Sequence, residues 1–91
     1  MRIDISTFGD VLISRPAGRE AFLAARAYTI PQNSTEQIEL DFSNVKVLTP
    51  SWADEFIQGL ESEYGKERLR VIEGSNVTVQ DTFGTMRILG G

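Results

Sequence analysis

Cysteine and histidine are both absent from this sequence of 91 residues. Without cysteine the chain can form neither disulfides nor thiolate metal sites. Without histidine it lacks the commonest general base and the commonest zinc ligand, and it cannot assemble a Ser–His or Cys–His nucleophile. We therefore expect no catalytic residues, no metal site and no cofactor, and we expect that the protein is not an enzyme.

Positive charge and long apolar runs are also scarce. Nine Lys and Arg residues stand against thirteen Asp and Glu, for a formal charge of −4, and the basic residues are dispersed. Nucleic-acid binding needs clustered positive charge, so we expect no nucleic-acid partner. No stretch reaches the ~18 apolar residues of a membrane span, and the first residues carry no apolar signal segment. We therefore expect a cytoplasmic protein without membrane contact. The sequence does not indicate its oligomeric state.

The chain does contain an ordinary hydrophobic fraction of 41% and enough length for one core, so residues 1–91 are predicted to form a single domain. Short segments of alternating or continuous apolar residues are typical of strands. These segments are residues 2–6, 11–13, 37–42 and 68–73. The run 11–13 has a second interpretation, the end of a loop packed on the core. The first two are expected to pair antiparallel across the turn at Gly9-Asp10.

Two helices are predicted from their first residues. Ser14 followed by Pro16 is a typical helix start, because the hydroxyl caps the first turn and proline needs no N–H there. Ser51 and Asp54 have the spacing of a capping box, and they begin a helix whose apolar stripe starts at Trp52. That stripe predicts that Trp52 is a core residue rather than an exposed recognition residue.

A third helix is predicted near the end of the chain. Thr78 and Asp81 again have capping-box spacing, and three apolar residues follow at roughly helical intervals: Phe83, Met86 and Leu89. Strands that alternate with helices favour a parallel or mixed sheet with right-handed crossovers. The predicted fold is a small α/β domain with a mixed, mostly parallel sheet of about four strands and three helices.

Two motifs of the sequence resemble those of a known family. The first motif consists of Asp41-Phe42, Val45 and the run Ser-Trp-Ala-Asp-Glu-Phe at 51–56. It resembles the core of STAS domains, the fold of anti-sigma factor antagonists. It resembles still more closely the STAS-like family of unknown function DUF4325. The Ile-Ser-Arg helix start at 13–15, with Arg19 four residues on, resembles the same family. The resemblance spans about Gly9 to Leu89 and implies a STAS-like domain.

The resemblance also implies a function. STAS domains are regulatory modules that bind a protein partner, and a GHKL-type ATPase kinase phosphorylates a Ser at the position that Ser51 matches. The residues beside it differ from the antagonist pattern, with Thr49-Pro50 before and Trp52 after. Ser51 is therefore either a phosphorylation site or a plain helix cap. A phosphate there would gain from the helix N-terminus and repel Asp54 and Glu55.

The arginine pair leaves two interpretations open. Arg15 and Arg19 lie on one helix face and can clamp an anionic group, or they can pair with Glu20 or a strand-end acid. We therefore expect a regulatory domain that contacts a protein partner, an ATPase or kinase-like regulator as the resemblance implies. The alternative is a sensor that binds an anionic small ligand or nucleotide through the arginine pair. The expected contact residues are Thr49, Ser51, Trp52, Asp54 and Glu55, with Ser14, Arg15 and Arg19 as a second group.

Overall fold

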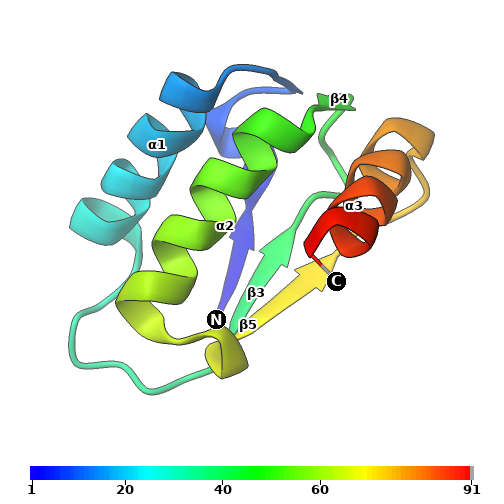
Figure 1. Cartoon of the computed structure of the whole chain (residues 1–91). Helices are drawn as coiled ribbons and strands as arrows, with labels where there is room; N and C mark the ends of the chain where they lie inside the picture. The colour runs from blue at the N-terminus through cyan, green and yellow to red at the C-terminus, as the bar shows by residue number, and fades with distance from the viewer. Residues whose placement is uncertain (91) are drawn as a thin grey trace.

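A three-stranded parallel sheet forms the base of the fold. The computed structural model describes the backbone of residues 1–90 and the side chains of residues 1–86. Strands β1 (Arg2–Asp4), β3 (Ile38–Asp41) and β5 (Leu69–Ile72) lie in the order β1-β3-β5. Both pairings are parallel, with Arg2 opposite Glu39 and Glu39 opposite Arg70. Helices α1 and α2 lie across one face of this sheet, and α3 lies beside β5 (Figure 1).

A second, smaller sheet lies at the end of the molecule where α1 and α2 begin (Figure 1). It consists of β2 (Val11–Leu12) and β4 (Val47–Leu48), which also pair in parallel. The α/β class and the mostly parallel sheet predicted from the sequence are confirmed. The expected antiparallel pairing of the first two strands is wrong, because β1 pairs with β3 and β2 pairs with β4.

The wrong pairing has a local cause. The Asp4 carboxylate accepts hydrogen bonds from the N–H and the hydroxyl of Ser6, at 3.0 and 2.7 Å, and this closes an Asx turn. The strand therefore ends at Asp4, and the 3₁₀ turn η1 (Ile5–Phe8) follows. Gly9, at φ +128°, then directs the chain into β2 beyond the sheet rather than back along β1.

The three predicted helices are α1 (Arg15–Ala24), α2 (Pro50–Tyr64) and α3 (Val77–Gly90). A π-helical turn, η2 (Ala25–Thr29), extends α1, and a 3₁₀ turn, η3 (Lys66–Arg68), follows α2. The third helix is capped by Asn76 rather than Thr78, because the Asn76 side chain accepts the N–H of Thr78 at 2.8 Å. The side chain of Leu89, in the predicted apolar stripe, lies outside the described residues.

One apolar core joins the helices to the sheet. The buried stripe of α2 packs over Ile3 and Leu40 of the sheet, and Phe42 meets Phe83 of α3 edge-on with ring centroids 5.0 Å apart. The opposite face of the sheet carries the in-register charged row Arg2, Glu39 and Arg70. In the part of the chain described, no helix combines the length and apolar character that a membrane crossing needs.

Candidate functional site

The starts of α1 and α2 are held together by their caps. The Ser14 hydroxyl accepts the N–H of Ala17 at 3.2 Å, which confirms the predicted cap of α1. Helix α2 is capped by Thr49, whose hydroxyl oxygen accepts the N–H of Trp52 at 3.4 Å. The same hydroxyl donates to the carbonyl oxygen of Ile13, just before the α1 cap. Thr49 therefore ties the first turn of α2 to the end of β2.

Ser51 is not the cap that its spacing to Asp54 predicted. Helix α2 begins one residue earlier, at Pro50, because proline is favoured in the first turn and the preceding Thr49 supplies the capping hydroxyl. Ser51 is thus the second helical residue, and it is exposed. Within the described residues its hydroxyl has no hydrogen-bond partner. A purely capping role for Ser51 is therefore excluded by the helix geometry.

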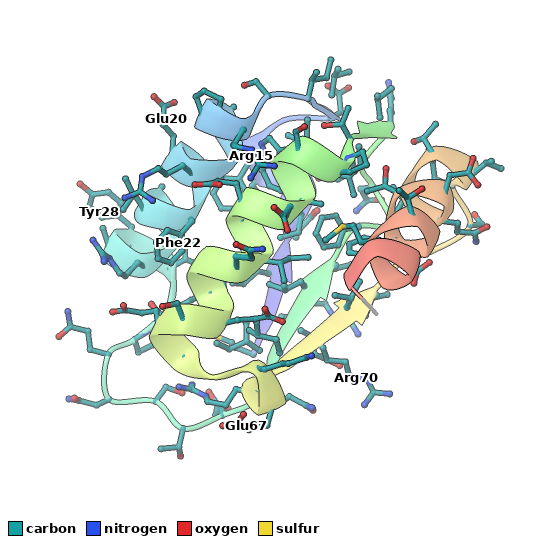
Figure 2. The ribbon with its side chains drawn as sticks, in the orientation of Figure 1. Arg15, Glu20, Phe22, Tyr28, Glu67 and Arg70 are labelled. Atoms are coloured by element: carbon teal, nitrogen blue, oxygen red, sulfur yellow. The ribbon has the colours of Figure 1, made fainter. Side chains whose placement is uncertain are left out.

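The predicted arginine pair lies against the predicted acidic pair. The Arg15 Nη1 atom donates to Asp54 Oδ2 at 3.1 Å and to Glu55 Oε2 at 3.0 Å, across the gap between α1 and α2 (Figure 2). Arg19 Nη1 lies 3.7 Å from Glu55 Oε1. The hydrogen bonds that Arg15 donates to Glu55 and then to Asp54 raise the pKa of Arg15, so it stays cationic. The acidic partners come from α2, not from Glu20 or a strand end.

This cluster lies at the surface, so its ion pairs contribute little to the free energy of folding. Half of the Arg15 side chain is exposed, and exposed ion pairs contribute about 0–1 kcal/mol each. The cluster therefore does little to hold the fold together. Its main consequence is to place a cationic group against Asp54 and Glu55, which follow Ser51 by three and four residues on α2.

Close approach of the two helices brings these charges together, and it depends on a glycine. A methyl group added at Gly18 would lie 2.5 Å from the carbonyl oxygen of Trp52, so only glycine fits at this helix crossing. A signal was present in the sequence, since a glycine inside a helical pattern is unfavourable by itself and can have a packing reason.

Trp52 is removed from the candidate contact surface. Only 1% of the residue is exposed, as the apolar stripe predicted, and its ring stacks on Phe56 with centroids 4.8 Å apart. A partner cannot reach a side chain that is buried to this extent. The contact residues that remain accessible on α2 are Ser51, Asp54 and Glu55, with Thr49 in its cap.

An exposed apolar patch adjoins the helix starts, and sequence reasoning missed it. Val11 and Ile13 are 51% and 54% exposed, and Val47, the register partner of Val11, is 37% exposed. Val11 and Val47 are therefore neighbours across the two strands, and Ile13 directly follows β2, two residues from Val11. Val77, 65% exposed, follows Asn76, whose side chain donates to the carbonyl oxygen of Lys46 at 3.1 Å. We call Val11, Ile13, Val47 and Val77 the valine–isoleucine patch.

The patch could have been anticipated only in part. The apolar run 11–13 was assigned to a strand, and in a two-stranded sheet with one buried face every second residue must point outward. The pairing of β2 with β4 brought the alternate residues of both strands to the same surface. That pairing was not visible in the sequence.

The acidic side chains of the described residues form no metal site. No group of three acidic side chains in the described part of the chain is arranged to hold a metal ion. The two carboxylates closest to the helix starts, Asp54 and Glu55, both accept hydrogen bonds from Arg15. Both carboxylates therefore already have a guanidinium as hydrogen-bond partner.

A family model described as the STAS-like domain of unknown function, DUF4325, matches residues 26–79. The match covers more than half of the chain and includes the start of α2, from Thr49 to Glu55. It does not include Ser14, Arg15 or Arg19, so it is shorter than the resemblance seen in the motifs. No curated protein and no solved structure matches the chain.

Proposed function

The chain belongs to the STAS-like domain family of unknown function DUF4325, and from this premise we propose that it is a non-enzymatic regulatory domain. It acts by reversible contact with a protein partner. The contact surface consists of the valine–isoleucine patch and the adjoining starts of α1 and α2. The partner class that the family resemblance suggests is an ATPase or kinase-like regulator.

The observation that carries the proposal is the valine–isoleucine patch. Contiguous exposed apolar side chains with a polar border are typical of protein-binding surfaces. Here the apolar part comes from β2 and the residue after it, from β4 and from the first residue of α3. Arg15 of the charged cluster follows Ile13 by two residues and contacts Asp54 and Glu55 at the start of α2. Interfaces of this kind take affinity from their apolar centre, and charged rims set partner choice and association rate.

Ser51 is the proposed control point of this surface. Ser51 is exposed, and Asp54 and Glu55 lie on the same helix start in contact with Arg15 of α1. A phosphate would add a charge of about −1.5 to −2 at neutral pH. It would repel Asp54 and Glu55, which lie three and four residues further along α2, and it would compete with them for Arg15. Phosphorylation would thus make the charged edge of the contact surface more negative and leave the apolar core unchanged.

The anion-sensor interpretation of Arg15 and Arg19 has weaker support. Both guanidinium groups already face carboxylates of α2. Arg19 lines a cavity of about 330 Å³ between α1 and α2, but Arg15 does not contribute to it. A small anion at this position would first have to displace Asp54 and Glu55. Contact with a protein requires no such displacement.

The test is affinity purification from the native cell with matched variants. The double variant Val11→Ser/Ile13→Ser removes the centre of the patch and is expected to fold, since both residues are exposed. Tyr28→Ser is the control, because Tyr28 is 91% exposed on η2 and points away from the helices (Figure 2). The proposal expects a partner that is retained by wild type and by Tyr28→Ser and lost by the double variant. Equal recovery with all three proteins would refute it.

The switch is tested separately with the purified partner. Ser51→Asp is expected to weaken binding at least about tenfold, equivalent to roughly 1.4 kcal/mol, while Ser51→Ala binds like wild type. Both variants should melt like wild type, because Thr49 and not Ser51 caps the helix. If Ser51→Asp binds as tightly as Ser51→Ala, the charge switch is wrong even when the contact surface is right.

A further inference from the structure

A surface cavity lies at the opposite end of the molecule from the helix starts. Its volume is about 620 Å³, within the range of small-molecule sites. It lies where η2 ends the first helix and where α2 passes into η3. The residues that line it are Arg26, Ala27, Gln32, Glu63, Tyr64 and Arg68.

Arg68 is held in place at this cavity but is not fully paired. Its Nε donates to the carbonyl oxygen of Glu36 at 3.1 Å, and its guanidinium carbon lies 5.6 Å from the centroid of the Tyr64 ring. Its Nη2 atom is buried and has no acceptor within the described residues. A buried charged donor without an acceptor destabilises the fold, because its lost contact with water is not replaced. An acceptor in the cavity would relieve that cost after a small movement of the side chain.

A second guanidinium lines the same cavity. Arg26 stacks on the Phe22 ring at 5.5 Å, and its Nη1 is 4.0 Å from Glu63 Oε2, which is long for an ion pair. The π-helical turn η2 carries Arg26, and the Ile30 N–H closes this turn by donating to the Ala25 carbonyl at 2.9 Å. Such turns are rare and occur frequently at functional sites.

The neutral side chains that line the cavity can also donate hydrogen bonds. No hydrogen bond joins the Tyr64 hydroxyl or the Gln32 amide to another described residue. Burial raises the pKa of Tyr64, so its phenol keeps its proton at neutral pH. Two guanidinium groups thus face one carboxylate, Glu63, and unpaired donors outnumber acceptors. A site of this composition favours an anion with several oxygen atoms.

We propose that this cavity binds a small oxyanion, a phosphate or carboxylate group of a molecule up to the size of a nucleoside monophosphate, with Arg68 and Arg26 as its main contacts. The site is separate from the proposed partner surface. Its occupancy does not depend on whether that surface binds a protein.

The test is NMR titration of the full chain with three probes: inorganic phosphate, succinate and adenosine monophosphate. Saturable shifts are expected in residues 26–32 and 63–68, and little change is expected at residues 13–19 and 49–55. Arg68→Ala should weaken binding by roughly tenfold to a hundredfold, as loss of a charge-assisted hydrogen bond implies. Arg70→Ala is the matched control, because Arg70 is exposed on the open face of the sheet, two residues away.

The probes separate the sources of the oxyanion. Binding of phosphate alone assigns an inorganic or phosphoryl group, binding of succinate alone assigns a carboxylate, and binding of the nucleotide alone requires its base as well. If Arg68→Ala fails to fold, Arg26→Ala decides by the same criterion. Saturable binding to none of the probes, shifts confined to residues 13–19, or equal affinities of wild type, Arg68→Ala and Arg26→Ala would each overturn the proposal.

Discussion

The substitution Gly18→Ala tests the helix crossing that assembles the candidate site. In an isolated helix this change would be favourable, because glycine is worse than alanine by about 0.8–1 kcal/mol in a helix interior. In this fold the new methyl group would lie 2.5 Å from the carbonyl oxygen of Trp52 and 3.2 Å from its Cα. These are backbone atoms of a buried helix turn, so they cannot move aside as a flexible side chain would.

The expected magnitude follows from the two opposing terms. Overpacking of a well-packed contact costs about 1–3 kcal/mol. The contact is shorter than real Cβ atoms show, so we expect a cost near the upper end and a net loss of about 1–2 kcal/mol after the helix-propensity gain. For a domain of this size 1 kcal/mol corresponds to about 4–8 °C in Tm. Gly18→Ala should therefore lower Tm by roughly 4–16 °C.

Gly84→Ala is the matched control for this experiment. Gly84 is also inside a helix, α3, and a methyl group added there would meet nothing within 4 Å. It should gain the full propensity term of about 0.8–1 kcal/mol and raise Tm. Thermal and urea unfolding of the three proteins measure both effects. If Gly18→Ala stabilises the domain as Gly84→Ala does, α1 and α2 are not in close contact at this point.

Four substitutions test the core, the cap and an acidic turn. Trp52→Ala should cost about 3–5 kcal/mol in urea unfolding, and a loss below about 1 kcal/mol would show that Trp52 is not in the core. Thr49→Ala should cost about 0.5–2 kcal/mol while Ser51→Ala stays within about 0.5 kcal/mol of wild type, and the reverse order would return the cap to Ser51. Hydrogen bonds from the Ser6 hydroxyl and N–H lower the pKa of Asp4 from its ordinary value of 3.8. The ionised carboxylate therefore stabilises the fold above pH 3.8, and this contribution is lost as the pH falls through the pKa of the folded state. Asp4→Asn should therefore show a smaller decrease in Tm on acidification than wild type, and parallel acid profiles would contradict this reasoning.

The sequence predicted the elements that depend on neighbouring residues. The apolar stripe of α2 placed Trp52 and Phe56 in the core, where both are now buried. Ser14 was identified as a cap because its hydroxyl reaches an N–H only three residues away. The strand at 37–42 was identified because alternation reports directly on a face that is buried. Local chemistry and periodicity were enough for these assignments.

Only the tertiary structure decided how distant residues meet. Arg15 and Glu55 were each singled out in the sequence, but their ion pair depends on a helix crossing at Gly18. The valine–isoleucine patch exists because β2 pairs with β4 instead of folding back on β1, and Thr49 caps α2 while its hydroxyl also reaches β2. The same capping boxes and apolar runs are compatible with several strand pairings and helix crossings of similar local free energy. Which arrangement forms is settled by how the whole chain buries its apolar surface, and no short motif contains that information.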